Sequence, residues 1–156
     1  MESIVVRDAV LDDLPVLLDF EQEIIKAERP LDPTIASGSV NYYNLSDYIA
    51  DATVKVVVAQ YGNEIVGSGY ALRKSARHYL DHKEYAYLGF MYVLPGFRGK
   101  GINQSITQKL MEWAREQGLF EVRLTVYENN TPAIKAYEKS GFEKHLNEMR
   151  IRLEQE

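Results

Sequence analysis

The sequence predicts an α/β fold built on one mixed β-sheet. Three segments carry this prediction: a nearly continuous apolar run in residues 84–94, an amphipathic stretch in residues 102–116, and an alternating stretch in residues 120–126. The first is typical of a strand buried on both faces, the second of a surface helix, and the third of a strand with one buried face. Because strand-like and helix-like segments interleave without any repeat, we expect one compact unit.

The sequence before these segments predicts a short strand, two helices and a long connection in residues 4–50. Residues 4–7 are the strand candidate, and apolar positions at helical spacing indicate a helix that begins near Asp12. Residues 27–44 contain two prolines and a glycine and keep no regular period, so we expect a long surface segment. A short helix over residues 45–50 follows, with Ser46 as its expected cap.

A β-hairpin is predicted next. Two β-rich runs meet at Gly62 and Asn63, which is a typical turn dipeptide. Gly67 and Gly69 interrupt the second run, and glycines inside a strand indicate a bulge or a close backbone approach. We therefore expect this strand to contain an irregular point.

The second half of the chain carries clear end signals for its elements. Pro95 ends the apolar run, and Gly118 fits the left-handed position that follows the amphipathic helix. A further helix is expected to begin with Thr131 as its cap and to end at Gly141. The last strand candidate covers residues 148–153.

Composition excludes several classes of protein. The 156 residues suit a single domain, 1–156, and a net charge of −5 argues against nucleic-acid binding. No apolar run reaches the roughly 18 residues of a membrane span. The chain has no cysteine, which excludes thiol catalysis, and its beginning lacks a secretory signal, so we expect a cytoplasmic protein. The histidines lack zinc-site spacing, so we expect no metal.

The corner between the apolar run and the amphipathic helix reads RGKGIN, from Arg98 to Asn103. The first N–H groups of a helix lack partners, the helix dipole makes that end positive, and glycine lets a ligand approach the main chain. With Arg98 and Lys100 the corner suits a phosphate or pyrophosphate; a solvated turn with two basic residues is the alternative. Ile102 stands where a Walker A loop has its lysine, and Asn103 breaks the dinucleotide pattern.

Two motifs resemble the GCN5-related N-acetyltransferase (GNAT) superfamily. The first, YVLPGFRGKGINQSITQKLMEWA, is similar to its acyl-CoA-binding motif, in which Gln or Arg is followed by two residues, Gly, one residue, and Gly or Ala. Arg98 and Gly101 fit this motif, and Asn103 departs from it. The second, YENNTPAIKAYEKSGF in residues 127–142, resembles a later strand–helix segment. The resemblance implies a GNAT-like fold with a mixed, mostly antiparallel sheet flanked by about four α-helices.

The resemblance also implies an activity and a site. The activity is acetyl-CoA-dependent transfer of an acetyl group to a primary amine. Tyr137 would be the general acid that protonates the departing thiolate, although its place on the helix stripe also suits a packing aromatic. The residues implied to bind acetyl-CoA are Met91, Tyr92, Val93, Arg98, Gly99, Lys100, Gly101, Ile102, Asn103 and Asn130.

The sequence leaves the general base open. Many relatives carry a glutamate in the strand before the glycine corner, but here that stretch reads EYAYLGF and Glu84 is its nearest carboxylate. His78 and His82 are of a type that titrates near neutrality, but they fall in a predicted loop. A chain of water molecules could carry the proton instead.

The resemblance places the amine acceptor beside the segment that follows the first helix. Acidic and aromatic side chains there would suit a cationic amine through charge and cation–π contacts; they are Glu28, Asp32, Tyr42 and Tyr43. Small amines, amino acids, antibiotics and protein amines all stay open as acceptors. A catalytically silent acyl-CoA-binding module is the alternative function, and an exposed strand edge could pair two copies into a homodimer.

Overall fold

The computed structural model describes residues 3–155 and contains a five-stranded sheet in the order β1-β2-β3-β4-β5. Neighbouring strands run antiparallel except β4 and β5, which are parallel, so the predicted mixed, mostly antiparallel sheet is confirmed. The strands are β1 (Ile4–Asp8), β2 (Lys55–Tyr61), β3 (Glu64–Ser75), β4 (Glu84–Val93) and β5 (Val122–Arg123). The helices are α1 (Leu14–Glu28), α2 (Leu45–Ala50), α3 (Ile102–Glu116) and α4 (Thr131–Lys139), with short 3-10 turns η1 (Leu11–Asp13) and η2 (Pro95–Phe97).

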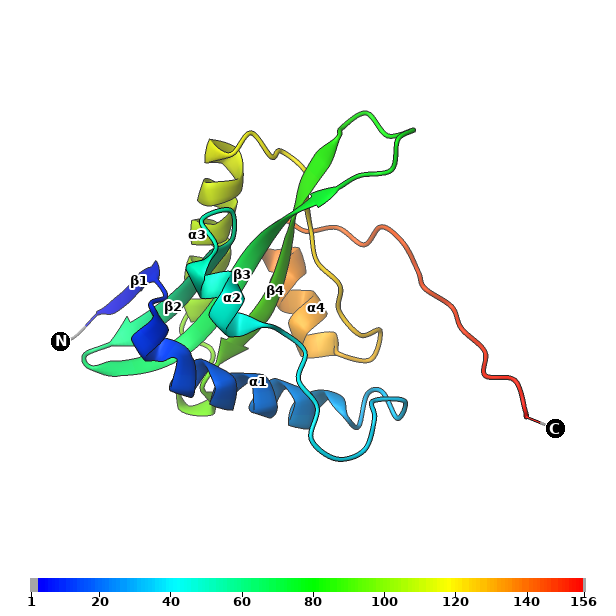
Figure 1. Ribbon diagram of the computed structural model, residues 1–156, viewed down its shortest axis with the longest axis horizontal. Helices are drawn as coiled ribbons and strands as arrows, with labels where there is room; N and C mark the ends of the chain where they lie inside the picture. Colours follow the sequence, from blue (N-terminus) through cyan, green and yellow to red (C-terminus); the bar gives the residue numbers. More distant parts are fainter. Residues whose placement is uncertain (1–2, 156) are drawn as a thin grey trace.

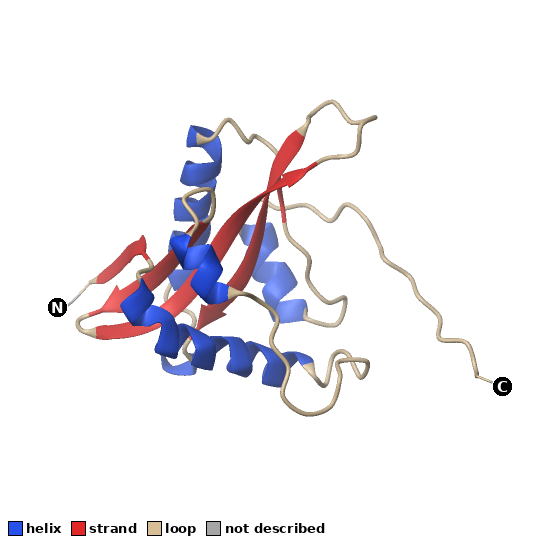
Figure 2. Ribbon diagram, viewed as in Figure 1, coloured by secondary structure: helices blue, strands red, loops and turns tan. Residues whose placement is uncertain are grey.

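Helices cover both faces of the sheet. Figure 1 shows α1 and α2 in front of the strands and α3 behind them, and Figure 2 separates helices from strands in the same view. The front layer packs Leu17 and Phe20 of α1 and Leu45 of α2 against β2, β3 and β4. The rear layer packs α3 against the opposite face of the same strands. The two layers enclose separate clusters of apolar side chains, because each strand alternates its side chains between the faces.

Helix α3 confirms the amphipathic helix that the sequence predicted at residues 102–116. Its buried residues are Ile102, Ile106, Thr107, Leu110, Trp113 and Ala114, which repeat at three- and four-residue spacing and so lie on one face. The next turn contains Gly118 at a φ of 75°, the left-handed conformation expected after a helix.

The glycines of β3 let α3 come close to the sheet. A methyl group at Gly69 would lie 2.7 Å from Cγ2 of Ile106 and 2.9 Å from Sδ of Met91. The register between β3 and β4 also shifts between Ser68 and Tyr70. In that shift the extra residue belongs to β4, while the pairing of β3 with β2 gives β3 one extra residue, Val66, beside Gly67. The prediction of an irregular point in this strand is therefore confirmed, and a helix packs directly on its main chain.

Four sequence expectations are wrong in detail. Residues 148–153 form no strand and belong to an extended segment, and β5 has only two residues of the longer strand predicted there. The cap of α4 is Asn130 instead of Thr131, because the Oδ1 atom of Asn130 accepts a bond from the N–H of Ala133 at 3.3 Å. In α2 the cap position is Asn44 and not Ser46.

An ion pair between a partly exposed arginine and a buried aspartate joins β1 to the start of the first helix. The Arg7 guanidinium donates to both carboxylate oxygens of Asp13, at 2.8 and 3.0 Å. The Val10 N–H donates to the same carboxylate at 2.8 Å. The bonds from Arg7 hold the pKa of Asp13 below its usual range despite burial, and the N–H of Val10 adds to this effect.

Within residues 3–155 no helix has both the length and the apolar character needed to cross a membrane.

We expect Asp13→Asn to lower the free energy of unfolding by about 2 kcal/mol, a modest value because Arg7 is partly exposed. The folded-state pKa of Asp13 lies below the unfolded value of about 3.9, so its stabilisation is present above about pH 4 and is lost as the pH falls through the folded pKa. Urea unfolding at several pH values measures this difference. The exposed neighbour Asp12→Asn is the control, and an equal loss in both variants would contradict the assignment.

Candidate active site

A bulge in the middle of β4 shapes the candidate site. Phe90 has a φ of 56°, a left-handed conformation that is rare for a large side chain. The Ser68 hydroxyl donates to the Phe90 carbonyl at 2.9 Å, and both residues are buried. A methyl group at Gly89 would lie 2.6 Å from the Tyr70 ring, so only glycine fits beside the bulge. The unusual conformation is thus held by hydrogen bonding and packing.

Beyond the bulge, β4 has no neighbour on one side. β5 pairs with β4 only at Ala86 and Tyr87, so the described structure gives the later residues of β4 no partner strand on that edge. Figure 2 shows the chain after β5 leaving the sheet and returning as α4. The backbone groups of β4 near Met91 and Val93 therefore have no strand beside them on the edge that faces away from β3.

The glycine corner follows directly on this open edge. Leu94 is fixed by a bond from its N–H to the Val66 carbonyl at 2.9 Å, and Nε of Arg98 donates to the Val93 carbonyl at 2.8 Å. Gly99 and Gly101 have φ values of 78° and 80°. These conformations need glycine, because other L-residues are strained there.

The amino end of α3 is free to bind an anion. Gly101 occupies the cap position and has no side chain, and no acidic residue lies in the first turn. The first N–H groups of the helix therefore lack an intrahelical or side-chain partner, and the helix dipole adds positive character. Lys100 lies exposed with its ammonium group 5.3 Å from the centre of the Phe97 ring. The donors and charges here fit a phosphate or pyrophosphate group.

Helix α4 carries Tyr137, the general acid that the resemblance implies. Asn130 caps the helix, and the Tyr137 ring meets Phe142 edge-on with 5.9 Å between ring centres. Burial, with a smaller contribution from the Glu28 carboxylate, raises the pKa of Tyr137 to about 12. The phenol is therefore protonated at neutral pH, and the Glu28 charge acts on it from the end of α1.

Glu28 belongs to a cluster of acidic and tyrosine side chains. Burial raises the pKa of Glu28 above its ordinary value, with the nearby Asp32 charge acting in the same direction. Asp32 behaves in the opposite way: hydrogen bonds from Thr34, Arg150 and Tyr127 hold its pKa well below the usual range. The pKa values of these two carboxylates thus shift in opposite directions, because burial dominates at Glu28 and hydrogen bonds dominate at Asp32.

Tyr127 was not predicted as a site residue. Its hydroxyl donates to Oδ2 of Asp32 at 2.8 Å, and burial together with that carboxylate raises its pKa to about 12. The only signal in the sequence was its place at the start of the second GNAT-like motif. The bond joins the segment after β5 to the segment after α1.

A buried glutamate positions the tyrosines expected at the acceptor side. Glu21 is fully buried in α1, and its Oε2 atom accepts bonds from the N–H groups of Tyr42 at 2.8 Å and Tyr43 at 2.7 Å. Its Oε1 atom and the Tyr42 hydroxyl have no partner among the described residues. The signal for Glu21 was present in the sequence, because it interrupts the apolar stripe of its helix.

The structure does not place Glu84 at the candidate site. Glu84 begins the ten-residue strand β4 and Val93 ends it, so they lie about 30 Å apart at roughly 3.3 Å per residue. Glu84 is instead paired with Arg73 at 2.7 Å, beside a cavity of about 510 Å³ at that end of the sheet. His82 contacts Asp81 and Arg123 in the same region, and His78 is exposed.

Nine of the ten residues implied to bind acetyl-CoA, in contrast, lie together between the end of β4 and the start of α3, and Asn130 caps α4. Met91, Tyr92 and Val93 end β4, and Arg98 to Asn103 form the corner that leads into α3. Residues 3–155 contain no group of three or more histidine, aspartate or glutamate side chains that could hold a metal ion.

Comparison with known proteins decides the family. The sequence profile of the Acetyltransferase (GNAT) family matches residues 21–142, which includes the bulged strand, the glycine corner and α4. The chain belongs to the GNAT acetyltransferase family. The resemblance seen in the two sequence motifs is therefore confirmed.

Individual relatives agree with this assignment. An uncharacterized N-acetyltransferase of Mycobacterium bovis is 28% identical to this chain over 97 residues, which are 62% of this chain and 58% of the relative. The chain thus spans less than two thirds of that mycobacterial relative. Glucosamine 6-phosphate N-acetyltransferase of Trypanosoma brucei brucei is 30% identical over 104 residues, 67% of this chain and 68% of the relative. A predicted acetyltransferase from Clostridium acetobutylicum, solved with acetyl-CoA, shares the fold with a TM-score of 0.71 at 17% identity, over 96% of each chain.

We expect Ser68→Ala to destabilise the GNAT chain by about 1–2 kcal/mol, because the buried Phe90 carbonyl loses its hydrogen bond. Thermal and urea unfolding measure the loss. Ser75→Ala, at the exposed end of the same strand, is the matched control and should change stability little. Equal stability of the two variants would show that the bulge does not depend on this bond.

Proposed function

We propose that the protein is an acetyl-CoA-dependent N-acetyltransferase that acts on a primary amine. The observation that carries the proposal is the uncapped amino end of α3, which lies where β4 has lost its neighbour. This arrangement offers backbone donors both for a pyrophosphate and for an extended chain beside β4. Family membership and the relative solved with acetyl-CoA support the same cosubstrate.

The binding roles follow the local geometry. The N–H groups of the corner and the first turn of α3, aided by Lys100, would hold the pyrophosphate. Backbone groups of Met91 and Val93 would bind the pantetheine and polarise the thioester carbonyl. Because the carbonyl of Val93 already accepts a bond from Arg98, Val93 would contribute its N–H group. Asn130 uses Oδ1 as a helix cap, which leaves its amide NH₂ to contact the cosubstrate.

Tyr137 is the proposed general acid. Bound acetyl-CoA would supply a thioester whose sulfur leaves as a thiolate when the amine attacks. At neutral pH the half-buried Tyr137 phenol keeps its proton because its pKa is raised, so it can donate that proton to the departing sulfur. The phenol would then recover a proton from solvent.

Glu28 is the proposed general base. It is the carboxylate whose charge acts on Tyr137, and burial raises its pKa toward neutrality. A base of this kind can accept the proton that the amine loses when its nitrogen attacks the thioester. Asp32 is less suited, because three partners hold it as an anion of low basicity.

The acceptor is proposed to be a cationic amine. Glu28 and Asp32 supply negative charge, and Tyr42, Tyr43 and Tyr127 supply aromatic faces in the same region. Charge attraction and cation–π contact both favour an ammonium group there. The relative named for glucosamine 6-phosphate makes amino sugars a sensible first panel.

A catalytically silent acyl-CoA-binding module is the alternative function. It predicts tight acetyl-CoA binding and no release of thiol with any amine. Calorimetry with acetyl-CoA, combined with a thiol-release assay on a panel of amino sugars, amino acids and peptides, separates the two functions.

We expect Tyr137→Phe to lower the rate of thiol release by at least about tenfold, since it removes the proton donor and keeps the ring. Acetyl-CoA affinity should stay unchanged in calorimetry, because the phenol acts on the leaving sulfur. Tyr79→Phe, at a largely exposed tyrosine, is the control. An unaltered rate in Tyr137→Phe would show that Tyr137 only packs in the structure and donates no proton.

We expect Glu28→Gln to lower kcat by about tenfold or more and to flatten the acidic limb of the pH–rate profile. The sign follows from the raised pKa: the base works only when deprotonated, so the wild-type rate should rise with pH through a value above the ordinary glutamate pKa. Glu116→Gln, on the exposed side of α3, is the control. A higher KM with unchanged kcat would show that Glu28 binds the amine without acting as its base.

A further inference from the structure

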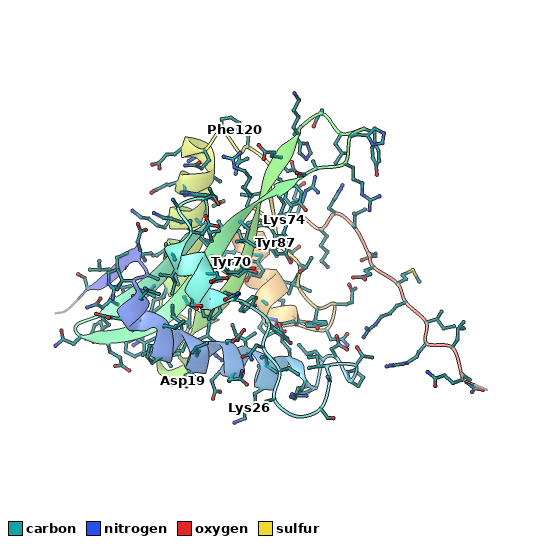
Figure 3. All side chains as sticks on the ribbon, viewed as in Figure 1. Asp19, Lys26, Tyr70, Lys74, Tyr87 and Phe120 are labelled. Carbon is teal, nitrogen blue, oxygen red and sulfur yellow. The ribbon has the colours of Figure 1, made fainter. Side chains whose placement is uncertain are left out.

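An arginine from the carboxyl-terminal part of the chain lies on the proposed acceptor side. Residues 143–155 contain no helix or strand, and Figure 1 shows them in red, running away from the sheet. Figure 3 shows side chains on both sides of this extended stretch. The guanidinium of Arg150 nevertheless donates to Oδ1 of Asp32 at 2.9 Å and to Oγ1 of Thr34 at 3.0 Å. A residue 118 positions later in the sequence than Asp32 thus adds a cation to the segment after α1.

The Asp32 carboxylate is held in one position by its own surroundings. It accepts bonds from the N–H of Thr34 at 2.9 Å and from the hydroxyl of Tyr127 at 2.8 Å. Only 12% of its side chain is exposed. A carboxylate fixed in this way orients the guanidinium that binds it, so Arg150 has less side-chain freedom to lose when a ligand binds.

Arg150 keeps donors that these contacts do not use. A guanidinium carries several N–H donors in one plane. The contacts with Asp32 and Thr34 engage part of this set, and 61% of the Arg150 side chain is exposed to solvent. The remaining N–H groups suit an oxyanion, because the planar fork of a guanidinium matches the oxygens of a carboxylate or a phosphate.

The arginine lies in the same cluster as the proposed base. Asp32 follows Glu28 by one helical turn, and its N–H donates to the Glu28 carbonyl at 3.0 Å. Tyr127, which bonds to Asp32, leads into the helix that carries Tyr137. Burial and the charges of Asp32 and Glu28 raise the pKa of Tyr127, while the positive charge of Arg150 acts to lower it. An acceptor whose amine reaches Glu28 therefore lies next to Arg150.

Arg150 also changes the charge that an acceptor meets. Because the guanidinium pairs with Asp32, this carboxylate offers little net attraction to a second cation. Glu28, the proposed base, then receives the amine nitrogen. A purely cationic amine would meet Arg150 as a like charge, whereas an acceptor with both an amine and an anion would find an opposite charge for each group.

We propose that the acceptor carries an anionic group, a carboxylate or a phosphate, beside its primary amine, and that Arg150 binds this group. The inference rests on the proposed function, because it takes Glu28 as the place of the amine. It narrows the acceptor class to amino acids, phosphorylated amino sugars and related amines that carry a negative charge. Residues 143–155 thus contribute a specificity-determining side chain to the acceptor side.

Calorimetry on the protein saturated with coenzyme A, which has no acetyl group to transfer, measures acceptor binding alone. Glucosamine 6-phosphate is compared with glucosamine, and alanine with alaninamide, so that each pair differs in one anionic group. At least one anionic probe should bind about tenfold more tightly than its partner without the anion, and the pair that shows this distinguishes phosphate from carboxylate. Equal affinity within both pairs, or no binding of either anionic probe, overturns the proposal.

Arg150→Gln tests whether this side chain causes the preference. The variant should weaken binding of the anionic probe until the affinity ratio of the selective pair is about one, and Arg150→Lys should keep part of the ratio, because lysine retains the charge and loses the planar fork. Arg152→Gln, at an exposed arginine of the same segment, is the matched control and should keep the full ratio. A ratio that survives in Arg150→Gln, or that falls equally in Arg152→Gln, overturns the proposal.

A different change in the same variant would also contradict it. If the ratio falls in Arg150→Gln only because the plain amine binds more tightly, Arg150 blocks the acceptor side instead of binding an anion there, and the proposal is overturned. Circular dichroism checks that the three variants are folded.

Thiol release from acetyl-CoA separates this inference from the proposed function. When both hold, the anionic probe should be the better substrate through a lower KM, because Arg150 binds the acceptor without touching the reacting atoms. Preferential binding without thiol release from any acceptor would contradict the transferase and still support the anion site. Thiol release with equal KM values for both members of each pair would support the transferase and overturn the role of Arg150.

Discussion

The left-handed Phe90 in the middle of β4 is the constraint on which the site depends. An extended strand would continue to pair with its neighbours on both sides, and the main chain of β4 would have no free groups. The bulge interrupts this ladder, and Ser68 and the flanking glycines hold it in place. The pairing of β4 with β5 has already ended at Tyr87, so the later residues of β4 have no partner strand on that side, and the glycine corner leads from the end of β4 into the amino end of α3.

Positive and negative charges are separated in the proposed site. The positive amino end of α3 and Lys100 lie on one side, and the carboxylates of Glu28 and Asp32 lie at the end of α1. One of these carboxylates is held as an anion by hydrogen bonds, and the other is kept less acidic by burial. A cosubstrate rich in phosphate and a cationic amine would therefore be drawn to different sides of the proposed site.

Hydrogen bonds to Asp32 join segments that are far apart in the chain. Asp32 accepts from Arg150 in residues 143–155 and from Tyr127 in the segment after β5. Helix α4, which carries the proposed acid Tyr137, follows Tyr127 directly, and none of its residues is fully buried. These bonds therefore fix the segment that leads into α4.

The sequence by itself determined the elements whose signals are local. The periodicity of α3, the turn at Gly62, the glycine breaks in β3 and the corner at Arg98 to Asn103 all follow from residue order, and two motifs indicated the GNAT family. Tertiary structure decided what depends on partners distant in the chain. It placed Glu84 at the far end of β4, gave the buried Glu21 its role, brought Glu28 to Tyr137, and left residues 148–153 extended. The physical reason is that a strand forms only where another edge accepts its hydrogen bonds, and a carboxylate acquires its basicity from burial and neighbours that sequence spacing does not encode.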